Sequence, residues 1–497
     1  MSLKAKSVKG IFWSGTGRVV RQVLGLGLTA VFARLLTPRD FGLLTMVMVF
    51  QGFAGLFRTL GLGTAVIQRR ELSEEQLTAV FFLNLFMGVL LSALIFLGAP
   101  LIAWFYEEPS LARIAQITCV GFIFTCVTVV HEALLVKRLQ FHRVVMAEFF
   151  AFLAAGTLAV VAAFKGLGVY ALVINTLASL FFSSLFVFIA NPWMPKAPPN
   201  WRSARGLMGF GMNVMGMNVL NYLHRHTDDL LVGKFLGSIQ LGYYSMAYKL
   251  MRLPTRQISG VVSAVAFPAF SSIQEDVGRI RRGFLMMSRY IGLLLFPALM
   301  GLIVVAPEAI PVPFGEKWRP AVFVIQILTV AGVLQSVQSP MSTLFMSRGR
   351  PNLLLRYQIL CTICYVTAFL VSVRWGINGV AVFYTGVTIL LSPLLYRLAF
   401  GLIRMKASDY FSAMKEPFLG SLAMAAIVFG YRSFCVQNGM TPWLLLITEV
   451  ALGILVYPLV LWLMDRKLYR ETVDLLRLLT RREKTGHTPA VSVVEER

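Results

Sequence analysis

Apolar stretches of about twenty residues recur along the whole chain, separated by short polar or Pro/Gly-rich connectors. Each stretch is long enough for a helix to cross a hydrocarbon core of roughly 30 Å. The pattern predicts an all-α, polytopic membrane protein with about fourteen transmembrane helices. The predicted spans lie near residues 10–34, 41–67, 77–105, 112–136, 144–164, 168–190, 207–233, 240–262, 284–310, 320–346, 355–373, 377–400, 413–433 and 442–464.

The spans form two sets of six, followed by two more. We therefore expect an N-terminal six-helix lobe (1–190), a cytoplasmic linker (191–206), a C-terminal six-helix lobe (207–400), two additional transmembrane helices (401–464) and a cytoplasmic tail (465–497). The linker carries four prolines, which favour a semi-rigid segment. A second long cytoplasmic connector is predicted near 263–283.

The two sets share an internal repeat. Residues 33–46 resemble residues 233–246, and each segment joins the first and second helices of its set. Residues 165–171 resemble 375–381, which enter the sixth helix of each set. Two matches in the same order, roughly two hundred residues apart, indicate a duplicated six-helix unit. Because each unit has an even number of spans, its copies should be related by a pseudo-twofold axis along the membrane normal, as in many secondary transporters.

Composition excludes a soluble protein. The chain of 497 residues is 57% hydrophobic and 14% charged, and its mean hydropathy is +0.73. The net charge of +23 does not indicate nucleic-acid binding, because Lys and Arg gather in connectors on one side of the predicted membrane. This asymmetry predicts that both termini are cytoplasmic. The five cysteines lack metal-site or disulfide spacing, and we expect no metal and no cofactor.

Several ionisable residues lie within the first two helices of each predicted lobe. Such a side chain at mid-bilayer costs roughly 2.5–3.5 kcal/mol on insertion scales, so it usually faces protein or water. Cations predominate, which predicts an electropositive cavity that binds phosphate or diphosphate. The candidate cavity residues are Arg18, Arg21, Arg58, Lys249, Arg252 and Arg256. For Arg58 and Arg256, near the inner helix ends, snorkelling to the interface is an equal alternative.

The predicted seventh helix carries both signs of charge. A carboxylate beside His and Arg in a low dielectric can change its protonation, so these residues are candidates for proton or cation coupling. An internal salt-bridge cluster is the alternative. The residues concerned are His224, Arg225, Asp228 and Asp229. Elsewhere, Glu132 and Glu148 flank the basic turn 137–143, and we expect them to pair with it.

Three segments carry a resemblance to a known family: residues 10–14 (GIFWS), 33–42 (ARLLTPRDFG) and 133–143 (ALLVKRLQFHR). The chain resembles the polysaccharide flippases of the multidrug/oligosaccharidyl-lipid/polysaccharide exporter superfamily, and is most similar to the lipopolysaccharide and exopolysaccharide branch with its colanic-acid-type members. The resemblance implies two six-helix lobes in a V shape with a cationic cavity between them. By position, Arg18, Arg21, Lys249 and Arg252 match the family's cavity residues.

The resemblance also implies a function. The expected activity is translocation of undecaprenyl-diphosphate-linked oligosaccharide repeat units from the cytoplasmic to the periplasmic leaflet of the bacterial inner membrane, for surface or exopolysaccharide synthesis. The expected partners are this lipid-linked oligosaccharide, membrane lipids, and the polysaccharide polymerase and export machinery.

Other functions stay open at this point. A multidrug exporter of the same superfamily should show acidic cavity residues, which the excess of Arg argues against. A flippase for peptidoglycan precursors would share nearly all these features. From a different class, a membrane-embedded polymerase or ligase needs acid/base residues on a sizeable extramembrane loop. The longest internal connectors are poor in carboxylates, so we expect a transporter and not an enzyme.

Overall fold

The computed structural model describes residues 20–58, 66, 73–199, 201–272, 276–466, 468 and 470, with the backbone alone for 201–217, 220, 257–269 and 271–272. Within these residues all regular structure is helical, as predicted. The helices are residues 20–35, α2 (Pro38–Gly55), α4 (Glu74–Tyr106), α5 (Ser110–Thr118), α6 (Gly121–Val127), α7 (Val129–Lys137), α8 (Phe141–Phe164), α9 (Val169–Ala190), α10 (Trp201–Ser272), α11 (Val277–Ala309), α12 (Pro311–Phe314), η1 (Glu316–Trp318), α13 (Ala321–Ser347), α14 (Pro351–Ser372), η2 (Val373–Trp375), α15 (Gly376–Leu402), α16 (Ala407–Gln437) and α17 (Pro442–Met464).

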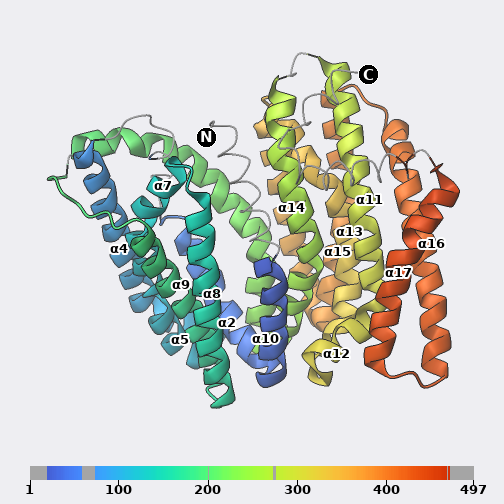
Figure 1. Ribbon diagram of the computed structural model, residues 1–497, viewed down its shortest axis with the longest axis horizontal. Helices are drawn as coiled ribbons and strands as arrows, with labels where there is room; N and C mark the ends of the chain where they lie inside the picture. Colours follow the sequence, from blue (N-terminus) through green and yellow to red (C-terminus); the bar gives the residue numbers. More distant parts are fainter. Residues whose placement is uncertain are drawn as a thin grey trace.

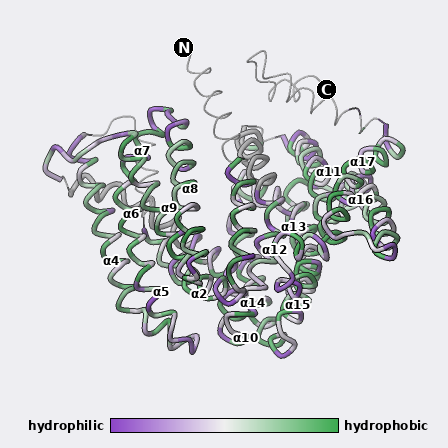
Figure 2. Tube along the Cα trace, turned by 60° about the horizontal axis from the view of Figure 1, so that its bottom comes forward, coloured by the Kyte–Doolittle hydropathy of each residue, from purple (hydrophilic) through white to green (hydrophobic). Residues whose placement is uncertain are grey.

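The helices form two groups with α2 and α10 between them (Figure 1). We refer to residues 20–35 with α2 to α9 as the first half, and to α10 to α15 as the second half. Helices α16 and α17 lie at the edge of the second half and pack against α11. Hydrophobic residues run along the helices, and hydrophilic stretches lie mainly at the turns (Figure 2).

Nine segments of the described chain are long and apolar enough to cross a membrane. The protein is therefore an all-α polytopic membrane protein, whereas the count of fourteen spans stays a prediction. Helices 20–35, α2 and α10 are not among the nine segments. They coincide with the predicted spans that hold the candidate cavity cations and Arg225, and these charges lower the local hydropathy.

Helix α10 is a hairpin of two helical arms. Its one non-helical residue is Gly237, with φ 81° and ψ 177°, a conformation that glycine adopts without steric cost. The Tyr244 hydroxyl donates a hydrogen bond to Asp228, at 3.1 Å. In a straight helix these residues would lie about 24 Å apart along the axis, so the chain must reverse between them. The predicted boundary between the seventh and eighth helices falls at this reversal.

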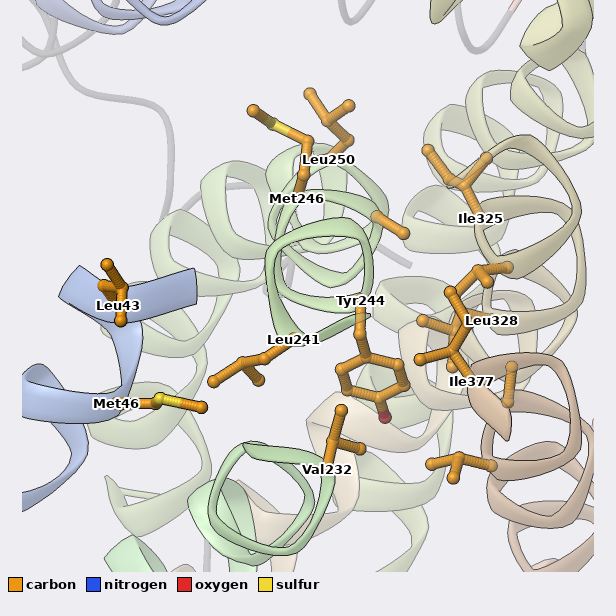
Figure 3. Packing of buried hydrophobic residues seen from close by; sticks show 14 of the residues in the cluster. Leu43, Met46, Val232, Leu241, Tyr244, Met246, Leu250, Ile325, Leu328 and Ile377 are labelled. Atoms are coloured by element: carbon orange, nitrogen blue, oxygen red, sulfur yellow. The ribbon is translucent and has the colours of Figure 1, made fainter. Parts of the chain in front are cut away.

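The two repeat segments pack directly against each other through α2 and the second arm of α10. Leu43 and Met46 of α2 share one buried cluster with Leu241 and Tyr244 of α10. Figure 3 shows this packing, with residues of α13 and α15 closing the cluster on the far side of α10. The hydroxyls of Thr45 and Ser245, at matching repeat positions, lie 3.5 Å apart. Like positions that meet in this way are expected around a local twofold axis.

Helical structure reaches into one predicted connector, and breaks divide one predicted span. The connector expected at 263–283 is largely helical, because α10 continues to Ser272 and α11 begins at Val277, where the Asp276 side chain caps the amide of Arg279. Hydropathy marks the edge of the membrane and not the end of a helix, so basic residues can continue a helix beyond it.

The span expected at 112–136 corresponds to the candidate membrane span Ser110–Lys137, which is divided into α5, α6 and α7. Near both breaks, threonine hydroxyls donate to the carbonyl four residues earlier: Thr118 to Ile114 at 2.6 Å and Thr128 to Phe124 at 3.4 Å. Such hydrogen bonds compete for the helix carbonyls and bend helices.

Candidate functional site

The second arm of α10 separates two polar pockets. Tyr248, Arg252 and Arg256 recur every four residues and face one pocket, while Ser245 and Lys249 face the other. We call these the arginine pocket and the lysine pocket. One amphipathic helix thereby distributes cations to two separate sites.

The arginine pocket has a volume of about 510 Å³. Its three charged residues are Arg225, Arg252 and Arg256, and no carboxylate is among its described lining residues. Arg225 donates to the Asn221 side chain at 3.0 Å, and Arg252 lies 5.5 Å from the ring centre of Tyr248. Guanidinium groups offer planar, paired donors to phosphate oxygens. The electrostatic character of this pocket therefore favours an anion.

Aromatic and amide side chains form the opposite wall of the arginine pocket. Tyr365 and Tyr384 stack with ring centres 5.0 Å apart, and Gln335 donates to the Tyr384 hydroxyl at 2.8 Å. Gln338 donates to Ser392 at 2.6 Å. Flat aromatic faces and fixed amides bind molecules that combine apolar faces with hydroxyl groups. These residues come from α13, α14 and α15, and the sequence analysis missed them because no local pattern connects them.

The lysine pocket, of about 470 Å³, lies on the other side of α10. Lys249 reaches across to the first half, where its ammonium donates to the Thr29 hydroxyl at 3.2 Å. The other polar side chains in the lining are uncharged: Thr45, Asn175, Thr176 and Ser245. This pocket carries one cation, against three in the arginine pocket.

Two of the remaining predicted cavity residues line neither pocket, and Arg18 lies outside the described residues. Arg21 forms an ion pair with Glu148. The expectation that Glu148 pairs with turn 137–143 was therefore wrong, since α8 turns this carboxylate toward the first helix. Arg58, three residues after the end of α2, has a buried Nε that finds no hydrogen-bond partner among the described residues. Of the five predicted cations that the structure describes, only Arg252 and Arg256 share one pocket.

The candidate coupling residues are divided among different surroundings. His224 and Arg225 line the arginine pocket, and His224 lies 3.0 Å from the Thr362 hydroxyl. Asp228 is buried and receives the hydrogen bond of Tyr244 described above. Asp229 pairs with His226 at 3.1 Å. These candidate coupling residues are thus close in sequence but lie in different environments. No group of three or more potential metal ligands occurs among the described residues.

A set of contacts joins the two halves at one end of the molecule, and we call it the latch. Arg34 donates to the carbonyls of Val312 at 2.5 Å and Pro313 at 2.9 Å. In return, Lys317 donates to the Arg34 carbonyl at 2.8 Å and Trp318 donates to the Ala33 carbonyl at 2.9 Å.

The Trp318 ring is fully buried between Phe41 and Tyr243, at centroid distances of 5.1 and 5.9 Å. Lys234 adds an ion pair to Glu107 at 2.7 Å. The latch joins residues between 127 and 285 positions apart in the chain, so no local sequence pattern predicts it.

Comparison with known proteins gives a consistent family. Residues 31–323 match the family described as polysaccharide biosynthesis protein. The lipopolysaccharide biosynthesis protein WzxC of Escherichia coli K12 is 31% identical over 376 residues, which cover 75% of this chain and 76% of WzxC. The teichuronic acid biosynthesis protein TuaB of Bacillus subtilis is 28% identical over 469 residues, or 92% of this chain and 95% of TuaB.

Solved structures share the fold. The lipid II flippase MurJ in an inward closed conformation superposes with a TM-score of 0.75 at 14% identity, covering 92% of this chain and 99% of MurJ. An inward-facing multidrug resistance transporter of the MATE family gives a TM-score of 0.63 at 17% identity, covering 80% of this chain and 96% of that chain. At these identities, the likeness concerns the architecture alone.

Proposed function

Because this chain belongs to the polysaccharide biosynthesis family of flippases, within the multidrug/oligosaccharidyl-lipid/polysaccharide exporter superfamily, we propose that it carries a lipid-linked oligosaccharide across the bacterial inner membrane. The proposed substrate is an undecaprenyl-diphosphate-linked repeat unit, which moves from the cytoplasmic to the periplasmic leaflet. Transport would supply a polysaccharide polymerase and the export machinery.

The arginine pocket is the observation that carries this proposal. Arg225, Arg252 and Arg256 provide positive charge for a diphosphate, and no described lining residue opposes them with a carboxylate. Tyr384 and Gln335 add hydroxyl and amide groups to the opposite wall, and such groups can hydrogen-bond to sugar hydroxyls. A pocket for cationic drugs would need the opposite charge, so its sign argues against the multidrug exporter.

The latch supports alternating access. It closes one end of the interface between the halves with hydrogen bonds from side chains to backbone carbonyls and with a buried tryptophan ring, whereas α2 and α10 provide a common packing surface along the centre. In our proposal the latch end faces the periplasm. Its opening then releases the oligosaccharide, while its closed state admits substrate from the cytoplasm.

The basic turns support this orientation. Residues 137–143 and 348–356 lie at the opposite end of the helices from α12, which belongs to the latch end (Figure 1). Positively charged connectors are retained in the cytoplasm, so both termini should be cytoplasmic. Labelling of single cysteines in whole cells tests this: Lys165→Cys should react with an impermeant maleimide, and Lys137→Cys should not. The reverse result would contradict the orientation.

A deletion strain tests the function. Loss of this protein should leave the lipid-linked oligosaccharide in the cytoplasmic leaflet and stop polysaccharide export, and the wild-type gene should restore both. Arg252→Ala should fail to restore export, whereas Arg113→Ala, at an exposed arginine of α5, should succeed. Normal export combined with lost drug resistance would instead identify a multidrug exporter. Arrest of peptidoglycan synthesis would identify a precursor flippase.

A further inference from the structure

Two carboxylates and one guanidinium meet where α11, α16 and α17 pack together, away from both pockets. Arg432 of α16 donates through Nε to both oxygens of Glu308 on α11, at 3.1 and 3.0 Å, and its Nη2 lies 3.0 Å from the same carboxylate. Glu449 of α17 lies on the other side of Arg432, with Nε and Oε1 separated by 3.9 Å. That separation is too long for a hydrogen bond.

Glu449 is a buried acid without a hydrogen-bond donor among the described residues. It is 1% exposed, and within that part of the chain neither of its carboxylate oxygens has a hydrogen-bond partner. A carboxylate in a membrane interior is normally paired and hydrogen-bonded, because the desolvation of an uncompensated charge costs several kcal/mol. The geometry of Glu449 therefore suits the neutral, protonated form of the side chain.

Charge counting around Glu449 gives the same result. The charged groups that face it are Arg432 of α16 and Glu308 of α11. Residues 311–314 of α12, which also packs against α17, carry no titratable side chain, and Arg34 of the first helix lies beside Trp443 of α17. Arg319 of the following turn lies near Glu308 but bonds to Glu316, at 2.8 Å. One guanidinium thus faces two carboxyl groups. The three side chains together have no net charge only when one of the two carboxyl groups carries a proton.

This cluster is attached to the latch by two short helical paths. Glu308 precedes Val312 by four residues, and the Val312 carbonyl accepts from Arg34. On α17, Trp443 lies six residues before Glu449, and the Arg34 guanidinium lies 6.0 Å from its ring centre. Arg34 therefore touches both the segment that follows Glu308 and the helix that holds Glu449. A rearrangement of Glu308 and Glu449 would therefore shift two contacts of Arg34, those with Val312 and with Trp443.

We propose that Glu308, Arg432 and Glu449 form a proton-binding site, and that its bound proton holds the latch closed. When the latch is open, the Glu449 carboxylate takes up a proton from hydronium in the bulk solvent, which leaves water, and closure buries the neutral acid. Loss of the proton leaves two carboxylates on one guanidinium, which favours reopening. The further step, that this proton drives transport, rests on the proposed function, whereas proton binding and latch closure do not.

Infrared difference spectroscopy of the purified full chain tests proton binding without transport. Spectra at about pH 5 and about pH 9, on either side of neutral, should show a protonated carboxyl band in the wild type. Glu449→Gln should lose this band. Glu308→Gln should lose it as well, because a single carboxylate can then pair with Arg432. Glu416→Gln is the matched control, since Glu416 also lies on α16 and pairs with Arg289 at 3.6 Å. A band that persists in Glu449→Gln would overturn the proposal.

Pulsed electron resonance tests the link to the latch. Spin labels at Lys165 and Arg374, both exposed, report the separation of the halves near the latch. In the wild type, the closed fraction should fall at least threefold between about pH 5 and about pH 9, and in Glu449→Gln it should stay high at both. A closed fraction that follows sodium concentration, and not pH, would indicate a metal-cation site and overturn the proposal.

Transport is measured separately, in vesicles with and without an imposed pH gradient. Accelerated flipping that disappears in Glu449→Gln is the expected result. If the chain moves no lipid-linked oligosaccharide while the infrared band and the pH-dependent closure are present, the proposed function fails and the proton site stands. If flipping is normal and the infrared band is absent, the proton site fails and the proposed function stands.

Discussion

Gly42 and Gly242, at matching positions of the two sequence repeats, make reciprocal contacts across the interface of α2 and α10. A Cβ atom on Gly42 would lie 1.7 Å from the carbonyl oxygen of Ser238, and one on Gly242 would lie 1.9 Å from that of Pro38. Pro38 and Ser238 are themselves at matching positions. The helices approach so closely that only glycine fits at either point.

Gly42→Ala and Gly242→Ala should therefore both destabilise the protein. The obstructing atoms belong to the backbone, so no side chain can rotate away, and overpacking of this kind costs about 1–3 kcal/mol. Thermal unfolding in detergent should show a lower midpoint for each variant. Gly98→Ala is the control, because a Cβ there meets nothing within 4 Å. An unchanged midpoint for Gly42→Ala would show that α2 and α10 can move apart to accommodate the methyl group without a loss of stability.

The arginine pocket gives the second prediction. Arg252→Ala should weaken binding of a short-chain prenyl diphosphate by roughly ten- to hundredfold, the equivalent of about 1.5–3 kcal/mol for a hydrogen bond to a charged group. Arg252→Lys should recover part of the affinity, since it keeps the charge and loses the planar pair of donors. Titration followed by native mass spectrometry measures both. Equal affinity in Arg252→Ala and wild type would show that Arg252 does not bind the diphosphate.

The latch gives the third prediction. Trp318→Phe keeps a ring between Phe41 and Tyr243 but removes the hydrogen bond to Ala33 and part of the buried ring system. The lost hydrogen bond alone costs about 0.5–1.5 kcal/mol, so the closed fraction should fall at least roughly twofold relative to the open one. The spin-label pair described above measures this ratio. Arg39→Ala is the control, because Arg39 bonds to Glu108 within the first half.

Acid should weaken the latch through Glu107. The Lys234 ammonium donates to this exposed carboxylate and holds its pKa below the ordinary glutamate value. A lowered carboxyl pKa means that the ion pair contributes fully above the ordinary value and is lost as pH falls through the lowered one. The closed fraction should therefore decline below about pH 4. Glu107→Gln should abolish this decline and leave the change between about pH 5 and 9 intact.

Sequence patterns predicted the helical architecture and the repeat, because hydropathy and self-similarity are local properties. The reversal at Gly237 also fell where the pattern placed it. The pairing of Arg21 with Glu148 and the separation of Lys249 from Arg252 did not follow from the sequence. Helical periodicity puts residues on a face of a helix, but the packing of neighbouring helices decides which pocket that face meets.

The residues missed altogether share one property: their partners are distant in the chain. Trp318 contacts Ala33 across 285 positions, and Arg432 contacts Glu308 across 124. In the sequence, Glu449 is an isolated acidic residue within an apolar stretch. Only the packing of α11, α16 and α17 brings it close to Arg432 and Glu308. An acidic residue within a predicted span was the available signal for Glu449, and a tryptophan in a polar turn was the signal for Trp318.

The turn at Gly237 has a mechanical consequence. A single residue separates the two arms of α10, and only residues 36 and 37 separate the first helix from α2. Because these connections are so short, we expect the two helices of each pair to rotate together as one rigid unit about the turn. Lengthening either hinge by a flexible residue would let the arms tilt independently and uncouple the movement of one pocket from that of the other.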